Sequence, residues 1–175
     1  MKRLILVFTL LVITHVAFAQ KFGFVDTDYI LKHIPDYSNA NKQLDALSKQ
    51  WQKESDNHFQ ELDLFYKAYQ KDQVLLSGDM KRKREQEIVG KEKDAKDFQK
   101  QKFGPDGELF RRRQALVKPI QDRVYKAIQD VAEDGLYAVI FDKSGDPTML
   151  YSAPRYDKSS DVIIKLGLKP GVFAK

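Results

Sequence analysis

The sequence predicts an α+β fold in which a small β body carries a long antiparallel α-helical hairpin. Residues 37–77 contain no proline or glycine and repeat apolar side chains at helical spacing. Segments 22–26 and 136–141 lie near opposite ends of the chain and are short, aromatic and β-branched, as strands are. Gly78 falls where the helical pattern stops and restarts, so we expect the chain to fold back there.

The composition excludes several classes of protein. Hydrophobic residues make up 42% of the 175 residues and aromatic residues 11%, which is too apolar for a disordered chain. The chain has no cysteine, which excludes a disulfide scaffold, a thiolate zinc site, an iron–sulfur site, a cysteine nucleophile and a lipid-modified cysteine.

Residues 1–19 have the three parts of a secretory signal peptide. Lys2 and Arg3 form a basic start, an apolar run follows, and Ala17 and Ala19 provide small residues before a cleavage site. We expect cleavage after Ala19 and export to the periplasm. The alternative is an uncleaved anchor helix, but the apolar run is short for a span of about 20 residues. Cleavage would remove two of the 30 basic residues and none of the 25 acidic ones, leaving 156 residues with a net charge of +3.

Segment 20–35 is predicted to hold the first strand and turn of the β body. The strand is 22–26, and residues from Tyr29 to Leu31 begin a short helix that stops near Pro35. Asp26 and Asp28 could be paired carboxylates for acid–base chemistry, but strand termination and helix capping explain them better. Asp36 or Ser38 can cap the helix that follows.

Segment 36–134 is predicted to be the helical hairpin arm. Its first helix carries a heptad seam, which slips once and resumes further along, and it runs to about residue 76. Gly78 is expected to follow that helix in a C-terminal cap, with Asp79 capping the next one. Residues 104–107 (Gly-Pro-Asp-Gly) should interrupt the second helical segment, and Pro119 should bend it. The seam residues are Tyr37, Ala40, Leu44, Leu47 and Trp51, then Leu62, Phe65 and Tyr69.

Segment 135–175 is predicted to complete the β body with a β hairpin and a terminal helix. Its strands are 136–141 and 148–151, joined by a turn at 143–146, and the helix ends at Gly167. Three short strands bury too little apolar area to offset the entropy of ordering them, and lone strands leave open edges. We therefore expect a homo-oligomer closed around the β body, with a subunit interface made by Phe22, Phe24, Val139, Ile140 and Phe141.

Enzymatic chemistry finds little support in the residues. Glu54, His58 and Glu61 share one helix face and could bind a metal ion, but a solvated polar cluster is the simpler interpretation. The glycine-containing segment 104–107 lacks the pattern of a phosphate-binding loop. We expect no catalytic residue, no metal site and no cofactor, and an enzyme is the least favoured class.

Two blocks of sequence carry a resemblance to a known family. Residues 21–37 (KFGFVDTDYILKHIPDY) resemble the opening strand motif of the Skp (OmpH-like) periplasmic chaperones. Residues 103–145 are similar to the return helix and β hairpin of its members. The resemblance implies a homotrimer with a β-barrel body and three coiled-coil arms around a cavity. It also implies an ATP-independent holdase for unfolded outer-membrane β-barrel proteins. The interruption at 104–107 departs from the continuous arm of the best-known members.

Two kinds of side chain on the arm are candidates for contact with such clients. Aromatic residues could hold apolar segments, although seam packing is the alternative for each of them. Basic residues could attract acidic client segments or acidic lipid headgroups, although a solvated helix face is the simpler interpretation. Acidic residues lie between the basic ones, so we expect no nucleic-acid partner. A coiled-coil spacer or adaptor of the envelope is the alternative function. The candidates are Phe59, Tyr66, Phe98, Phe103, Arg111, Arg112 and Arg113.

Overall fold

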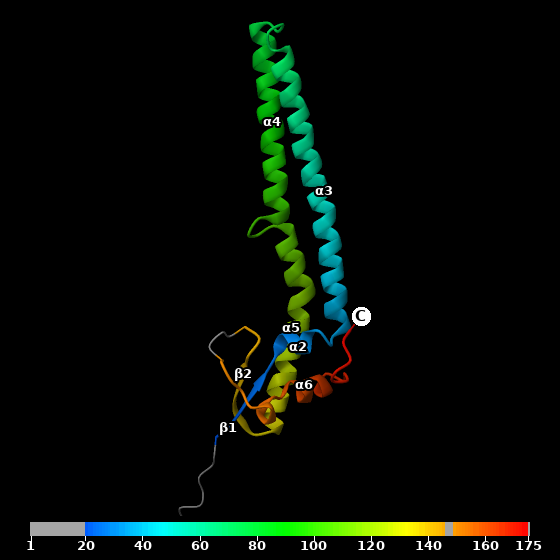
Figure 1. Cartoon of the computed structure of the whole chain (residues 1–175), viewed down its shortest axis with the longest axis vertical. Coiled ribbons are helices and arrows are strands. Elements are labelled where there is room, and N and C mark those ends of the chain that lie inside the picture. The colour runs from blue at the N-terminus through cyan, green and yellow to red at the C-terminus, as the bar shows by residue number, and fades with distance from the viewer. Residues whose placement is uncertain (1–19, 146–148, 175) are drawn as a thin grey trace, which may run out of the picture. The chain divides into compact units, whose positions relative to one another are not determined.

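The computed structural model describes residues 20–145 and 149–174, and the predicted signal peptide lies outside these ranges. The chain forms two compact units. We call residues 20–33 and 124–172 the body, and residues 34–123 the arm, with 173 and 174 grouped in the arm's unit. Figure 1 shows the long helices of the arm and the short elements of the body. Most described residues are helical, and the arm is a long helical hairpin.

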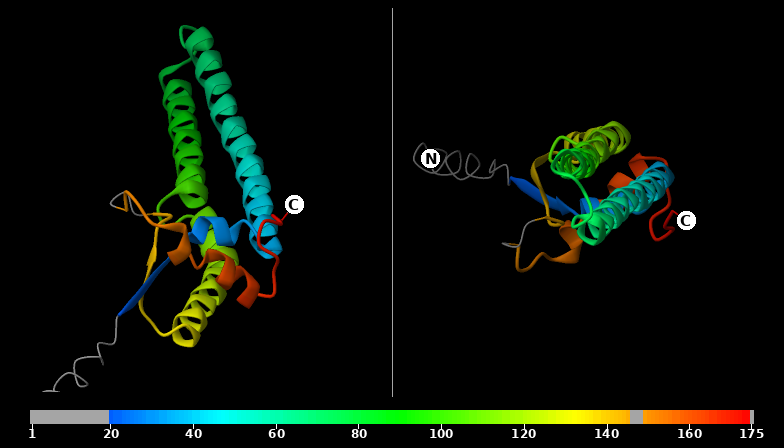
Figure 2. Two further views of the ribbon diagram at one scale, coloured as in Figure 1. Left: turned by 60° about the horizontal axis from the view of Figure 1, so that its bottom comes forward. Right: turned by 90° about the horizontal axis from the view of Figure 1, so that it is seen from above.

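Strands β1 (Lys21–Val25) and β2 (Tyr137–Asp142) form the body's two-stranded sheet. They pair in parallel, with Phe24 opposite Phe141, and Figure 2 shows them side by side. The other edge of β1 makes one backbone contact. Phe24 forms a β-bridge with Asp157, and the Phe24 carbonyl accepts a hydrogen bond of 2.8 Å from the Lys158 N–H.

The predicted β hairpin is therefore wrong for the described residues. Residues 149–151 form no strand, and residues 146–148 lie outside the described ranges. The physical reason is that β2 pairs with β1 along the full length of both strands, so β1 takes the place of a hairpin partner. The chain after β2 instead returns past the other edge of β1, where η1 (Pro154–Tyr156) precedes the bridge at Asp157.

The core of the body lies between short helices and the end of a long one. Helix α2 (Thr27–Leu31) packs against α6 (Ser159–Lys165), and α5 (Glu108–Asp134) contributes its residues from 124 onward. Asp26 caps α2 by accepting a hydrogen bond of 2.8 Å from the Tyr29 N–H, as the capping interpretation predicts. The buried apolar residues are Phe24, Val25, Ile30, Leu31, Val124, Ala127, Val162 and Ile163.

His33 is a buried polar residue of this core. Its Nδ1 lies 2.8 Å from the carbonyl oxygen of Tyr29 and must donate there, because a carbonyl can only accept. Its Nε2 accepts a hydrogen bond of 3.0 Å from the Gly171 N–H. The imidazole thus ties the segment after α6 to helix α2, which is a structural role.

The arm pairs α3 (Pro35–Asp72) with α4 (Gly78–Phe103). Three of the seam residues on α3, Ala40, Leu44 and Trp51, are buried, and Tyr37 and Leu47 are half-buried. After the predicted slip in the seam, Leu62, Phe65 and Tyr69 are half-buried. The buried residues of the paired helices are Ala40, Leu44, Trp51, Ser55, Ile88 and Ala95.

The helix ends differ from the prediction in three places. Helix α3 begins at Pro35, whose fixed φ suits a first helical position, so neither Asp36 nor Ser38 is its cap. Helix α3 ends at Asp72, short of the expected residue 76. Helix α4 begins at Gly78 and is capped by Ser77, whose Oγ accepts from the Met80 N–H, so Asp79 is inside the helix. Pro119 is likewise inside α5, which continues through it.

Candidate functional site

Two of the candidate aromatic residues are exposed on the arm. Phe59 and Tyr66 on α3 are 37% and 51% exposed. They lie seven residues apart, which places them on one face of the helix. The residues that meet α4 are on the neighbouring face, so these two rings are available to other molecules.

The other two candidate aromatic residues pack inside the arm. The ring of Phe98 lies 5.0 Å from that of His58, and the ring of Phe103 meets Trp51 edge-on at 6.5 Å. Both phenylalanines are half-buried by these contacts. The structure thus places Phe98 and Phe103 in the seam, the alternative that the sequence analysis kept for them.

A lysine joins these rings across the interruption in the arm. The Lys102 ammonium lies 4.7 Å from the centre of the Trp51 ring and 5.8 Å from that of Phe98. It also forms an ion pair with Glu108, the first residue of α5. The hydrogen bond from Lys102 lowers the pKa of the Glu108 carboxyl, which favours its charged form.

The interruption itself is a tight turn that needs its glycines. The Gly107 N–H donates a 2.8 Å hydrogen bond to the Gly104 carbonyl. A Cβ at Gly104 would lie 2.4 Å from the carbonyl oxygen of Lys100, and one at Gly107 would lie 2.8 Å from that of Lys102. A hollow of about 580 Å³ lies beside the turn and is lined by both acidic and basic side chains. The three candidate arginines, Arg111, Arg112 and Arg113, follow on α5 and are exposed.

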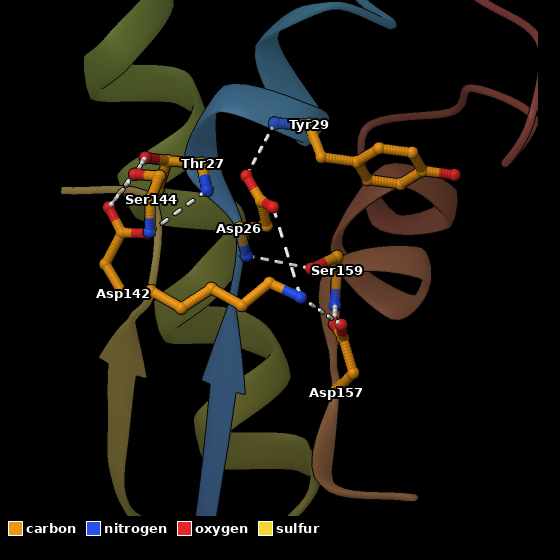
Figure 3. A network of polar contacts seen from close by, with 8 residues as sticks. Asp26, Thr27, Tyr29, Asp142, Ser144, Asp157 and Ser159 are labelled. Carbon is orange, nitrogen blue, oxygen red and sulfur yellow. Dashed lines mark hydrogen bonds and ion pairs between the residues drawn. The ribbon is translucent and has the colours of Figure 1, made fainter. Parts of the chain in front are cut away.

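A polar network holds β1 and the segments that flank it together in the body (Figure 3). The Asp26 N–H donates to the Ser159 Oγ at 2.8 Å. Asp157 accepts from the Ser159 N–H at 2.9 Å and from the Lys143 ammonium at 3.0 Å. The same ammonium lies 4.0 Å from the Asp26 carboxylate. These bonds connect the end of β1 with the start of α6 and the residue after β2.

The second half of the network centres on Asp142. Its carboxylate accepts hydrogen bonds from the Thr27 hydroxyl at 2.6 Å and from the Ser144 N–H at 3.0 Å. Desolvation alone would raise the pKa of Asp142, but the hydrogen bonds from Thr27 and Ser144 outweigh it and the pKa is lowered. The pKa of Asp157 is lowered in the same way: desolvation opposes the change, and the bonds from Ser159 and Lys143 overcome it. Charged, fully bonded carboxylates of this kind fix a fold rather than perform proton transfer.

Three of the five candidate interface residues, Phe22, Phe24 and Phe141, line an apolar pocket in the body. The pocket holds about 590 Å³ and is lined mainly by aromatic side chains and Met149. Phe22, Val139 and Phe141 are exposed and Ile140 is half-buried, whereas Phe24 is only 5% exposed. Phe24 therefore belongs to the core of the single chain, with one side of its ring facing the pocket. The aromatic lining residues are Phe22, Phe24, Phe141, Tyr151 and Tyr156.

Two properties of the described residues bear on other kinds of site. Within residues 20–145 and 149–174, no group of three or more His, Asp and Glu side chains is arranged to hold a metal ion. Glu61 forms an ion pair with Lys91 and Glu54 accepts from Gln50, so these candidate ligands have other partners. No helix in the described part of the chain is long and apolar enough to cross a membrane.

The sequence analysis missed one group of exposed residues at the turn between α3 and α4. Val74, Leu75 and Met80 are exposed there. The run Val-Leu-Leu at 74–76 next to the predicted turn was a signal for them. These residues were expected to lie inside the first helix of the arm, which was predicted to continue to residue 76, whereas α3 ends at Asp72.

The comparisons with known proteins agree with this architecture. The chain belongs to the family described as outer membrane protein (OmpH-like), whose model matches residues 21–166. Its fold is similar to that of an OmpH-like protein from Caulobacter crescentus CB15, which is described as a candidate outer membrane chaperone. That similarity has a TM-score of 0.65 at 13% identity and covers 90% of each chain. No curated protein matches the chain.

Proposed function

We propose that the protein is an ATP-independent holdase of the periplasm that binds unfolded outer-membrane β-barrel proteins. Membership of the OmpH-like family supports a chaperone role. The observation that carries the proposal is the pair of rings, Phe59 and Tyr66, which are exposed seven residues apart on one face of α3 in the long arm. Exposed aromatic rings bind apolar segments of many sequences, as a holdase must. The signal peptide would deliver the chain to the periplasm.

The mechanism rests on many weak contacts. Each aromatic contact stabilises a bound chain by about 1 kcal/mol. Repeated over several arms in one oligomer, such contacts reach a useful affinity because binding at one arm raises the effective concentration at the next. Arg111, Arg112 and Arg113 add attraction for acidic client segments, and salt weakens that part over a Debye length of about 8–10 Å.

The oligomer in this proposal is a homotrimer closed around the body. A two-stranded sheet is marginally stable by itself, and β2 has one neighbouring strand in the described chain. Exposed Phe22 and Phe141 line the apolar pocket, and a second copy could cover them together with Val139, which is also exposed. The trimer number comes from the family resemblance.

The test is suppression of aggregation of an unfolded β-barrel protein at stoichiometric amounts. The double variant Phe59→Ser, Tyr66→Ser should keep its oligomer and helix content while its client affinity falls several-fold. Leu64→Ser is the matched control, because Leu64 is also exposed on α3 but faces another side. A double variant that melts much earlier with unchanged affinity per folded oligomer would place both rings in the arm core. If the wild-type protein fails to suppress aggregation, the spacer or adaptor hypothesis is favoured.

A further inference from the structure

His33 joins two segments of the body that lie far apart in the sequence. We call residues 167–174, which follow α6, the tail. The Gly171 N–H of the tail donates a 3.0 Å hydrogen bond to Nε2 of His33, while Nδ1 of His33 is bonded to the Tyr29 carbonyl. The imidazole is only 2% exposed. The ring is therefore shielded from water and has both of its nitrogens engaged.

The start of the tail is fixed by the end of α6. Gly167 has φ 76°, in the left-handed region that favours glycine. Its N–H donates to the Ile164 carbonyl, and the Leu168 N–H donates to the Ile163 carbonyl at 3.0 Å. These two bonds form a Schellman cap, which holds Leu168 without help from His33.

The next part of the tail is a turn that presents one amide to His33. Residues 169–172 are closed by a 3.3 Å backbone hydrogen bond between the first and the last of them. Pro170 and Gly171 occupy the centre, and φ 79° at Gly171 makes this a type II turn. The turn does not use the Gly171 N–H itself. Among the hydrogen bonds of 167–172 within the described ranges, the bond to His33 is the one that reaches another element.

This bond requires the neutral form of the ring. Nδ1 carries the proton of the neutral ring, because its carbonyl partner can only accept, so Nε2 has a lone pair for the Gly171 N–H. A second proton would sit on Nε2 and face the Gly171 N–H, so that two donors would meet at 3.0 Å. A buried charge must be paired or reach water. Within the described residues no carboxylate is buried, so the protonated ring has no buried partner.

The charged groups of the surrounding elements do not change this. The Tyr29 ring meets the imidazole edge-on, with 4.6 Å between ring centres. On α5, Asp130 is half-buried and forms an ion pair with Lys126. The other charged residues of α2, α6, the tail and the start of α3 are exposed: Asp28, Lys32, Asp36, Asp161, Lys165 and Lys169.

We propose that His33 is a pH-sensitive latch that releases the tail when the ring takes up a second proton. In the neutral ring, Nε2 accepts from Gly171 and the turn 169–172 is held on the body. Protonation removes that acceptor, so the turn leaves and the imidazolium reaches water. The cap at Gly167 keeps its bonds, so α6 stays folded. Histidine is the side chain that ordinarily titrates between pH 5 and 8, so moderate acid opens the latch. This inference does not depend on client binding.

The first experiment measures hydrogen exchange of single backbone amides by NMR, from pH 7.5 to 5.0, in the chain from Gln20 onward. The protection factor corrects each rate for its intrinsic pH dependence. Because opening takes up one proton, protection of the Gly171 amide should fall about tenfold per pH unit below about pH 6. The Leu168 amide, bonded to Ile163 in the same segment, is the matched control and should keep its protection. Constant protection at Gly171, or an equal fall at Leu168, overturns the proposal.

The second experiment uses variants and the ring's own signals. His33→Gln offers an amide oxygen that accepts at every pH, so protection at Gly171 should no longer depend on pH. His58→Gln, at an exposed position of α3, should keep the wild-type dependence. Should His33→Gln not fold, the imidazole ¹⁵N shifts of the wild type decide. They should show the proton on Nδ1 at pH 7.5, and an imidazolium that forms while Gly171 stays protected overturns the proposal.

Discussion

Asp157 allows the role of the body's polar network to be measured. Asp157→Asn keeps the shape of the side chain and can still accept from the Ser159 N–H, which lies 2.9 Å from the carboxylate. It removes the charge that meets the Lys143 ammonium at 3.0 Å and can direct an amide N–H at that ammonium. We expect the variant to be folded but less stable.

The magnitude follows from the bonds that change. A hydrogen bond to a charged group contributes about 1.5–3 kcal/mol. The Asp157 and Lys143 side chains are 29% and 32% exposed, so the lower part of that range applies. We therefore expect the free energy of unfolding to fall by about 2 kcal/mol at neutral pH. The same substitution at Asp122 removes an exposed pair with Lys118 and should change it by less than about 1 kcal/mol.

The loss of unfolding free energy in Asp157→Asn should depend on pH. The folded-state pKa of Asp157 is lowered from its ordinary value of 3.8. Its charge thus stabilises the fold fully above that ordinary value, and the contribution disappears as pH falls through the folded-state pKa. The gap between wild type and Asp157→Asn should therefore narrow as the solution is acidified below about pH 4.

Chemical denaturation followed by circular dichroism, at one protein concentration and a series of pH values, measures this gap. A fixed concentration is needed because the stability of an oligomer depends on it. A gap that stays constant into acid would refute the reasoning, since the lost stability would then not come from the carboxylate charge.

Three further predictions concern the interface, a strained residue and the arm turn. Val139→Asp should place an unpaired carboxylate in the proposed interface at a cost of several kcal/mol, and a variant that still sediments as the wild-type oligomer would exclude that interface. Leu136 has φ 52° and is 83% exposed, so Leu136→Gly should relieve left-handed strain and raise stability by about 0.5–1 kcal/mol; a lower melting temperature would show that the leucine side chain is needed. Gly107→Ala should destabilise the arm by about 1–3 kcal/mol, since its Cβ would lie 2.8 Å from the Lys102 carbonyl oxygen. A Cβ at Gly90 would have no other atom within 4 Å, so Gly90→Ala should raise the melting temperature. Equal effects of the two glycine substitutions would contradict the steric argument.

The arm could be predicted from the sequence because a helix with one partner buries one face. Ala40, Leu44 and Trp51 follow the heptad spacing and are buried. The same spacing placed Phe59 and Tyr66 outside the seam. Helix ends were less predictable, because Ser77 and Asp79 are both good caps two residues apart and the choice depends on where α4 begins.

Strand pairing could not be predicted in the same way. Alternation and β-branching in 22–26 and 136–141 indicate strands but carry no information on direction or neighbour. The nearness of 148–151 in sequence favoured a hairpin, whereas β2 pairs in parallel with β1 from the other end of the chain. Phe98 and Phe103 were ambiguous because their burial depends on His58 and Trp51, which lie on the facing helix.

The parallel pairing of β1 with β2 has a consequence for the order of folding. The two strands are separated by the whole arm, and closing a flexible loop of that length costs about 4 kcal/mol before any strand contact forms. A formed arm removes most of this cost, because the ion pair of 2.6 Å between Asp36 and Arg123 brings together residues that lie just after β1 and before β2. The arm hairpin can pair from its turn outward, beginning with contacts close in sequence such as Tyr69 with Glu85. It should therefore form first and act as the template on which the sheet closes. Residues that stabilise the arm would then control the folding rate of the body, although they lie outside its core.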